Sequence, residues 1–239
     1  MRVLYIGGTG EISLSCVQQS VARGHQVAVF NRSQRDEALP AEVEQITGDL
    51  LDEHAYQKLA TREFDVVCQF LVYEAASAQR DLEHFAGHCG QYVFISSAAA
   101  YRKPHHQGFV TEATPLDNPF WAYARSKAAC ERLLLEAGDR LPVTIVRPSH
   151  TYRTRFPSTV IDGNHLAWRI LQGKPVLVHD GGQTVWTLTH SDDFAVAFTR
   201  LLERPQSRGG AYHITSDEAL PWRTILESVG GVLGGCRRL

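Results

Sequence analysis

Glycines separate a buried strand pattern from a helical pattern near the beginning of the chain. The apolar residues 3–6 run directly into Gly7-Gly8-Thr9-Gly10, and an apolar helical period begins at Ile12. A strand, a glycine turn and a helix in this order bring backbone N–H groups to the helix N-terminus, where they attract anions. The order therefore predicts a parallel α/β fold with a dinucleotide-binding loop, and a glycine turn without a ligand is the alternative interpretation.

Individual positions of this loop have different expected roles. Gly7 permits the tight turn, and Gly10 lets the backbone approach a pyrophosphate. Ser13 stands where the usual pattern has a third glycine, and it is small enough for close helix packing. The residues expected to contact the cofactor here are Gly7, Gly8, Thr9, Gly10, Glu11 and Ile12.

Strand and helix patterns alternate through the first half of the chain. Several strand patterns are almost continuously apolar, which is typical of parallel strands covered on both faces. Such an alternation predicts right-handed βαβ units and a doubly wound parallel sheet of the Rossmann type. The predicted strands are 2–6, 26–30, 43–47, 65–70, 91–95 and 143–146, and the predicted helices are 12–23, 53–61, 75–87 and 120–136.

The pattern loosens after Pro148, so we divide the chain into a dinucleotide-binding core, 1–150, and a small substrate lobe, 151–239, interleaved with the core. The glycines between 230 and 235 should end the last helix near Gly230 and leave the tail frayed. The elements expected here are a loop over 151–158, a helix over 163–172, a hairpin over 175–190 turning at Asp180-Gly181-Gly182, a helix over 192–203, a strand over 211–215 and a last helix with Pro221 at its first position.

The composition is that of an ordinary globular protein and excludes several functional classes. Hydrophobic residues make up 44% of the 239 residues and charged residues 21%. A net charge of -2 disfavours a dedicated nucleic-acid binder. No apolar run approaches the ~18 residues of a membrane span, and no signal peptide is evident. The 5 cysteines are scattered and odd in number, which predicts reduced thiols in a cytoplasmic protein rather than disulfides or a metal site.

The second predicted strand ends in Asn31-Arg32 rather than in an acidic residue. An NAD-selective site places Asp or Glu here to hold the ribose 2′-OH. An arginine can instead pair with a 2′-phosphate through two parallel hydrogen bonds. We therefore expect Asn31 and Arg32 to contact the cofactor and NADP to be preferred over NAD, with a solvated turn arginine as the alternative.

Asp49 and Leu50 follow the third predicted strand. Their place at a strand end would bring Asp49 near the adenine amino group of a bound dinucleotide. A plain turn aspartate is the alternative interpretation.

The chemical site is predicted from a Tyr–Lys spacing and a Ser pair. Tyr123 and Lys127 lie at i and i+4, on one helix face. A nearby ammonium lowers the pKa of a phenol, which could then exchange a proton with a substrate oxygen. The fifth predicted strand runs into Ser96-Ser97, at the strand end where ligands bind in such sheets. A surface Tyr–Lys pair is the alternative.

Together these residues resemble the extended short-chain dehydrogenase/reductase family, the NAD-dependent epimerase/dehydratase-like group, over nearly the whole chain. The family's glycine motif is similar to residues 7–13, and its Arg-Pro segment is similar to residues 147–152. Its Ser…Tyr-x-x-x-Lys constellation matches Ser97, Tyr123 and Lys127. The resemblance implies that these three are catalytic, that Tyr123 and Lys127 also contact NADP or NAD, and that the protein takes a small-molecule substrate and forms a homodimer.

Departures from the family pattern bear on the substrate. Ala98 and Ala99 stand where nucleotide-sugar dehydratases of the family carry an Asp-Glu pair, so that dehydration is not expected. Arg153 replaces the glycine that usually follows the Tyr of the Arg-Pro segment, so the pocket should differ. We place substrate contacts at His150 and Arg153. Family members run longer, so we also expect a truncated or frameshifted lobe, an open cleft and weak activity or none.

Two further residues near these motifs are expected to be structural. Arg147 follows a buried strand and should stabilise the fold. Trp121 precedes Tyr123 by two residues, and we expect it to be a packing residue rather than one that stacks on a ligand.

The favoured interpretation is an NAD(P)-dependent oxidoreductase or epimerase acting on a hydroxyl or carbonyl substrate, with a nucleotide sugar as one candidate. Tyr123 would be the acid/base, Lys127 would lower its pKa and hold the ribose, and Ser97 would orient the reacting oxygen. The alternative is a catalytically silent NAD(P)-binding protein, either regulatory or RNA-associated.

Cofactor preference gives the first test. We expect the protein to bind NADP more tightly than NAD, because Arg32 replaces the acidic residue of an NAD site. Arg32→Ala should remove the difference, since the 2′-phosphate then loses its partner. Titrating both cofactors against both proteins measures this, and equal affinities in the unmodified protein would contradict it.

Overall fold

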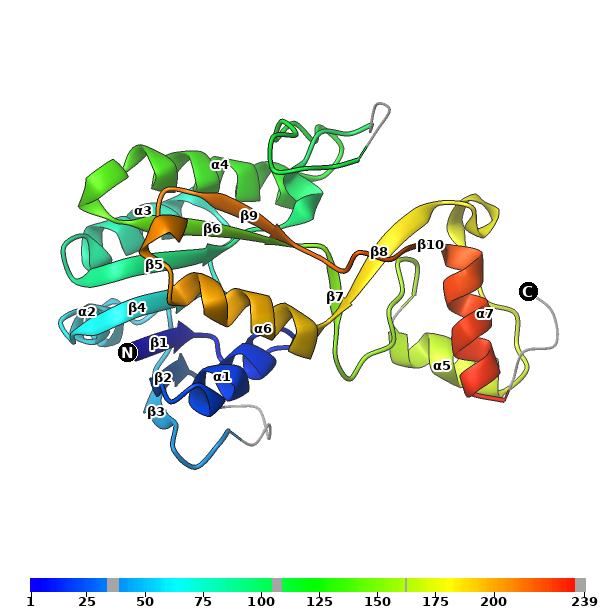
Figure 1. Ribbon diagram of the computed structural model, residues 1–239, viewed down its shortest axis with the longest axis horizontal. Coiled ribbons are helices and arrows are strands. Elements are labelled where there is room, and N and C mark those ends of the chain that lie inside the picture. The colour runs from blue at the N-terminus through cyan, green and yellow to red at the C-terminus, as the bar shows by residue number, and fades with distance from the viewer. Residues whose placement is uncertain (34–38, 105–108, 162, 235–239) are drawn as a thin grey trace.

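The strands of the main sheet all run parallel, and their order reverses beside β1. The computed structural model describes residues 1–33, 39–104, 109–161 and 163–234. Its seven-stranded sheet has the order β3-β2-β1-β4-β5-β6-β9 (Figure 1), which confirms the predicted doubly wound sheet. The strands are β1 (Arg2–Ile6), β2 (Gln26–Asn31), β3 (Glu44–Thr47), β4 (Phe64–Gln69), β5 (Cys89–Ile95), β6 (Val143–Pro148) and β9 (Ala211–Ile214).

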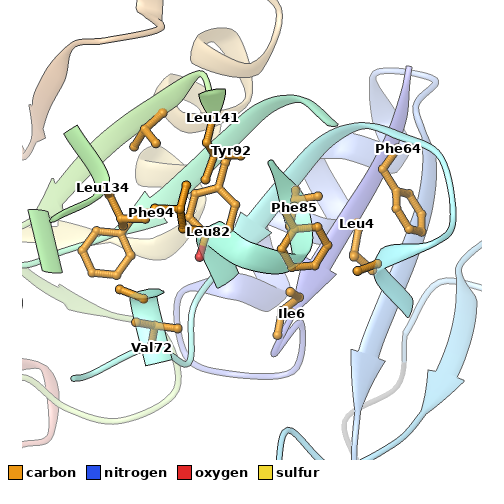
Figure 2. Packing of buried hydrophobic residues seen from close by; sticks show 14 of the residues in the cluster. Leu4, Ile6, Phe64, Val72, Leu82, Phe85, Tyr92, Phe94, Leu134 and Leu141 are labelled. Carbon is orange, nitrogen blue, oxygen red and sulfur yellow. The ribbon is translucent and has the colours of Figure 1, made fainter. Parts of the chain in front are cut away.

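Alternate residues of the central strands enter two separate hydrophobic clusters, one on each face of the sheet. On β1, Val3 and Tyr5 belong to one cluster, and Leu4 and Ile6 belong to the other. Figure 2 shows the second cluster, where Leu4 and Ile6 pack with side chains from the helices. The covering helices are α1 (Ser13–Ala22) and α6 (Ser191–Leu202) on the first face, and α2 (Glu53–Ala60), α3 (Ala75–Phe85) and α4 (Ala122–Glu136) on the second.

A smaller lobe lies beyond the carboxyl ends of the strands, at the right of Figure 1. Its three-stranded sheet has the order β10-β8-β7, and a third hydrophobic cluster joins it to two helices. None of the helices in the described residues is long and apolar enough to cross a membrane. The lobe comprises β7 (His150–Tyr152), α5 (Gly163–Leu171), β8 (Val185–His190), β10 (Ala219–Pro221) and α7 (Trp222–Val232), and the short helices are η1 (Ala98–Ala100), η2 (Gly138–Arg140), η3 (His179–Gly182) and η4 (Pro205–Ser207).

The predicted hairpin over 175–190 is wrong. Only its second arm is a strand, and the predicted turn lies in η3, where Asp180 and Gly181 have positive φ angles of 49° and 57°. β8 pairs instead with β7 and with β10, which places Leu220 opposite Trp186. Pairing with distant segments completes an apolar face that a local hairpin would have left open.

Two other expectations about this half of the chain differ from the structure. Residues 150–152, of which 151 and 152 were expected to be loop, form β7 beside β8. The last helix begins after Pro221, which is its N-cap, and continues past Gly230 to Val232. Gly230 is buried in this helix, so close packing outweighs the low helix propensity of glycine. The expectation that the tail is frayed concerns residues 235–239, which lie outside the described residues.

A buried carboxylate joins β4, β5, α2 and α3 inside the second cluster. Asp81 on α3 accepts hydrogen bonds from Tyr56 Oη at 2.7 Å, from Tyr92 Oη at 2.5 Å and from Gln69 Nε2 at 2.6 Å. Burial raises the pKa of Asp81, although these hydrogen bonds act to lower it. The network satisfies polar groups that the interior would otherwise leave without partners.

We expect Asp81→Ala to lower the free energy of unfolding by about 3 kcal/mol, because it leaves three buried donors unsatisfied. Replacing the exposed Asp139 with alanine should change it by less than about 0.5 kcal/mol. Chemical denaturation of both variants measures the difference, and similar effects of the two substitutions would contradict the structural role of Asp81.

Candidate functional site

The glycine loop lies at the carboxyl end of β1, where the strand order of the sheet reverses. Gly7 has φ +88°, and its N–H donates to the Phe30 carbonyl at 3.0 Å. A Cβ on Gly7 would lie 2.6 Å from Leu71, and one on Gly8 would lie 2.7 Å from Val29. The loop therefore has a backbone conformation and surroundings that require glycine, as a cradle for a pyrophosphate does.

Helix α1 begins directly after this loop. Its N-cap is Ile12, which supplies no side-chain hydrogen bond to the helix N-terminus. Ser13 Oγ accepts a hydrogen bond from Gly10 N at 2.9 Å, so the residue in place of the third glycine closes the loop. A helix N-terminus without a side-chain cap is suited to bind a phosphate group.

The Glu11 side chain forms hydrogen bonds within the protein. Its carboxylate accepts hydrogen bonds from Thr154 N at 3.1 Å and Thr154 Oγ1 at 2.8 Å. Burial acts to raise the pKa of Glu11, but the Thr154 hydrogen bonds and the charge of Arg153 leave it lowered. Ser191 Oγ donates to both the Glu11 and Tyr152 carbonyls, at 2.7 and 3.0 Å. Glu11 thus joins the glycine loop to the loop after β7.

The end of β2 presents an arginine at the surface. Asn31 Oδ1 accepts from Ser33 N at 2.9 Å and from Ser33 Oγ at 3.1 Å, and Ser33 has φ 49°. Ser33 Oγ is also 3.0 Å from Thr47 Oγ1 of β3. The Asn31 side chain therefore shapes the turn, and Arg32 is exposed at the same strand end.

Asp49 and Leu50 form the turn after β3. Asp49 Oδ1 accepts from Leu51 N at 2.9 Å, and the Leu50 carbonyl accepts from Arg80 Nη1 at 2.6 Å. The partner of Asp49 lies in its own turn and that of Leu50 on α3, and both residues are half-buried.

The structure brings Ser97 and Tyr123 together at the carboxyl end of β5. Ser97 is the N-cap of η1, and Tyr123 lies in the first turn of α4. Burial raises the pKa of Tyr123, and a hydrogen bond with the Ser97 side chain acts to lower it. The pKa is raised in sum, whereas the sequence led us to expect Lys127 to lower it. The difference arises because half-burial of the phenol outweighs its hydrogen bond.

Lys127 is buried one helical turn further along α4. Its ammonium donates to the Val72 carbonyl at 2.7 Å and to the Ile95 carbonyl at 2.8 Å. It also lies 4.6 Å from the ring centroid of Tyr73, but 5.9 Å from that of Tyr123. Burial lowers the pKa of Lys127 to about 8. The side chain thus joins α4 to the ends of two neighbouring strands.

The two adjacent serines have separate roles. Ser96 is buried and donates to Glu131 on α4, so it is not directed to Tyr123. Glu131 pairs with Arg147 Nη2 at 2.6 Å, and Arg147 Nη1 donates to Tyr101 Oη at 3.3 Å. This buried network agrees with the structural role expected for Arg147.

The two candidate substrate residues lie on the lobe side of the site. His150 is half-buried on β7, with its ring 5.5 Å from that of Trp186 and 5.9 Å from that of Trp222. Burial lowers the pKa of His150, which favours its neutral form. Arg153 lies near enough to Glu11 for its charge to lower the pKa of that carboxyl.

Two aromatic neighbours of Tyr123 were not identified as site residues from the sequence. The ring centroid of Trp121 lies 4.9 Å from that of Tyr123, and the centroid of Tyr73 lies 6.3 Å away. Trp121 is 55% exposed, and its ring lies against that of Tyr123. It precedes α4, where the chain arrives from an exposed loop. Tyr73 could have been found from its place just after β4, at the carboxyl edge of the sheet.

Known proteins resemble this chain in sequence and in fold. Residues 3–215 match the model of the NAD dependent epimerase/dehydratase family. The 2'-dehydrokanamycin reductase of Streptomyces kanamyceticus is 31% identical over 240 residues, covering 98% of this chain and 67% of the relative. The 2-alkyl-3-oxoalkanoate reductase of Stenotrophomonas maltophilia is 30% identical over 259 residues, covering 99% and 77%. The Thermus thermophilus UDP-glucose 4-epimerase, solved in complex with NAD, has a TM-score of 0.80 at 25% identity, covering 99% of this chain and 84% of that chain.

The buried ion pair of Glu131 and Arg147 should make the protein sensitive to the loss of either charge alone. Glu131→Ala is expected to lower the free energy of unfolding by about 3–5 kcal/mol, because Arg147 would be left buried without a counter-charge. Replacing both residues with methionine should cost less than the single change. The exposed pair of Arg62 and Glu44, at 2.7 Å, is the control, and Glu44→Ala should cost no more than about 1 kcal/mol. Equal losses at the two sites, measured by chemical denaturation, would contradict this.

Proposed function

Because the chain belongs to the NAD dependent epimerase/dehydratase family, we propose that it reduces a ketone to a secondary alcohol, with NADPH as the preferred reductant. Membership confirms the sequence-based expectation of an NAD(P)-dependent oxidoreductase or epimerase, and with it a nicotinamide cofactor and a small-molecule substrate. The observation that carries the proposal is the proximity of Ser97 and Tyr123, which lie near enough for the Ser97 side chain to act on the pKa of Tyr123, beside the buried Lys127 at the carboxyl edge of the sheet.

The residues of the glycine loop fit a dinucleotide. Gly7 and Gly8 lie against the side chains of Leu71 and Val29 with no room for a Cβ, and the uncapped N-terminus of α1 follows at the end of the loop. The exposed Arg32 would hold a 2′-phosphate at the end of β2. When bound, the nicotinamide supplies or accepts the hydride.

Tyr123 is suited to donate a proton to a ketone oxygen. Its raised pKa keeps the phenol protonated at neutral pH, and a protonated phenol is the form needed in the direction of reduction. The Ser97 hydroxyl would hydrogen-bond the same oxygen and orient it between the two side chains. Lys127 would stabilise the negative charge that develops on the phenol as its proton leaves.

Two observations favour ketone reduction over the other activities of the family. Ala98 and Ala99 follow Ser97 in η1, so this helix supplies no acid/base pair for a dehydration. The two relatives at 30% identity or more are both named as reductases, one of a dehydrokanamycin and the other of an oxoalkanoate. We assign the silent NAD(P)-binding or RNA-associated alternative a lower rank, because Ser97, Tyr123 and Lys127 are all present and adjacent. A homodimer and a cytoplasmic location remain predictions.

Tyr123→Phe tests the proposal directly. The variant should bind NADPH with unchanged affinity and reduce ketones at least about 100-fold more slowly, because only the proton-donating oxygen is removed. Cofactor titration and NADPH oxidation over a panel of ketones measure the two properties. Ser126→Ala, one position before Lys127 on the same helix, is the control and should retain both. Normal turnover of the Tyr123→Phe variant would show that the mechanism is wrong.

A further inference from the structure

Trp121 and Tyr73 lie next to Tyr123 but come from different elements. Trp121 is the N-cap of α4, and Tyr73 follows β4. Their ring planes are tilted against that of Tyr123 by 42° and 43°. The proposed proton donor therefore has an aromatic neighbour from the helix and another from the sheet edge.

Both neighbours are exposed, unlike most large aromatic side chains of the core. Trp121 is 55% and Tyr73 48% exposed, whereas Tyr92 and Tyr101 are both fully buried. Exposed aromatic area that gathers at a strand's carboxyl edge is typical of a surface that a ligand covers. Both rings lie beside the phenol that the proposed reaction uses.

We propose that Trp121 and Tyr73 are the walls of the subsite for the substrate carbonyl, so that the substrate presents apolar carbon, in a ring or an alkyl chain, on both sides of that carbonyl. The inference rests on the proposed ketone reduction and specifies its substrate class. It assigns to both residues a specificity-determining role, in which they bind the substrate without exchanging protons.

The apolar walls select against an acidic group next to the carbonyl. A carboxylate placed against aromatic carbon loses its hydration without gaining a partner. The Lys127 ammonium is buried, and the Val72 and Ile95 carbonyls accept two of its three N–H groups. A 2-oxo acid should therefore bind poorly where a simple ring or alkyl ketone binds well.

Tyr73 has a second contribution, through Lys127. The ammonium lies 4.6 Å from the Tyr73 ring centroid, within the range of a cation–π interaction. Removal of the ring would expose the buried ammonium on that side, whereas Tyr73→Phe keeps the ring and loses only the hydroxyl. The phenylalanine variant therefore separates the wall from any chemistry of the Tyr73 phenol.

Binding of probe ketones to the NADP⁺-saturated protein tests the inference without requiring turnover. We expect cyclohexanone and 2-octanone to bind at least about tenfold more tightly than pyruvate, measured by isothermal titration calorimetry. Trp121→Ala and Tyr73→Ala should each weaken cyclohexanone binding by about tenfold, because each removes one apolar wall. Trp121→Phe and Tyr73→Phe should restore most of the affinity.

Phe120→Ala is the matched control. Phe120 is adjacent to Trp121 and 76% exposed, and its backbone N–H donates to Asn118 Oδ1, a bond that the substitution preserves. The variant should change cyclohexanone affinity by less than about twofold. An equal loss in Phe120→Ala, pyruvate binding as tight as that of the two ketones, or no binding of either ketone to the unmodified protein would overturn the inference.

The reaction itself is followed separately, as NADPH oxidation with the same three compounds. If the ketones bind and the wall variants lose affinity but no NADPH is oxidised, the subsite is supported and the proposed reduction fails. If NADPH is oxidised with pyruvate as readily as with cyclohexanone, the reduction is supported and the aromatic subsite fails.

Discussion

The geometry of the candidate site depends on one buried ammonium. Lys127 donates to the Val72 carbonyl, which follows β4, and to the Ile95 carbonyl, which ends β5. A buried charge is unfavourable unless hydrogen bonds replace its hydration, and these two carbonyls do so. The side chain thereby fixes α4 against the edge of the sheet. Ser97 and Tyr123 lie on the two elements that are joined in this way.

A second buried attachment lies one helical turn further along α4. Glu131 accepts from Ser96 at the end of β5 and from Arg147 at the end of β6. The helix is therefore attached to adjacent strands of the sheet at two levels. Because Ser96 and Ser97 are neighbours, the hydrogen bond between Ser96 and Glu131 also restricts where the Ser97 hydroxyl can lie. Such a rigid arrangement suits a site in which two oxygens must meet one substrate atom.

Local patterns predicted the sheet well and the lobe poorly. Residues 3–6 read as a continuous apolar run, and β1 alternates between two buried faces, as parallel strands do. The sequence pattern wrongly predicted that β8 pairs with the residues just before it in a hairpin over 175–190. The true antiparallel partner, β10, is a three-residue strand far along the chain, and it has no period that a sequence pattern could reveal.

The sequence by itself determined the glycine loop, the order of strands and helices in the first half of the chain, and the positions of the chemical groups Ser97, Tyr123 and Lys127 along it. These follow from backbone requirements and from short spacings, which are local properties of a chain. Only the tertiary structure decided that Glu11 bonds to Thr154, that the pKa of Tyr123 is raised, and that Trp121 remains exposed. Each of these depends on burial and on contacts between segments that are distant in sequence, and no local pattern encodes the amount of water that folding removes from a side chain.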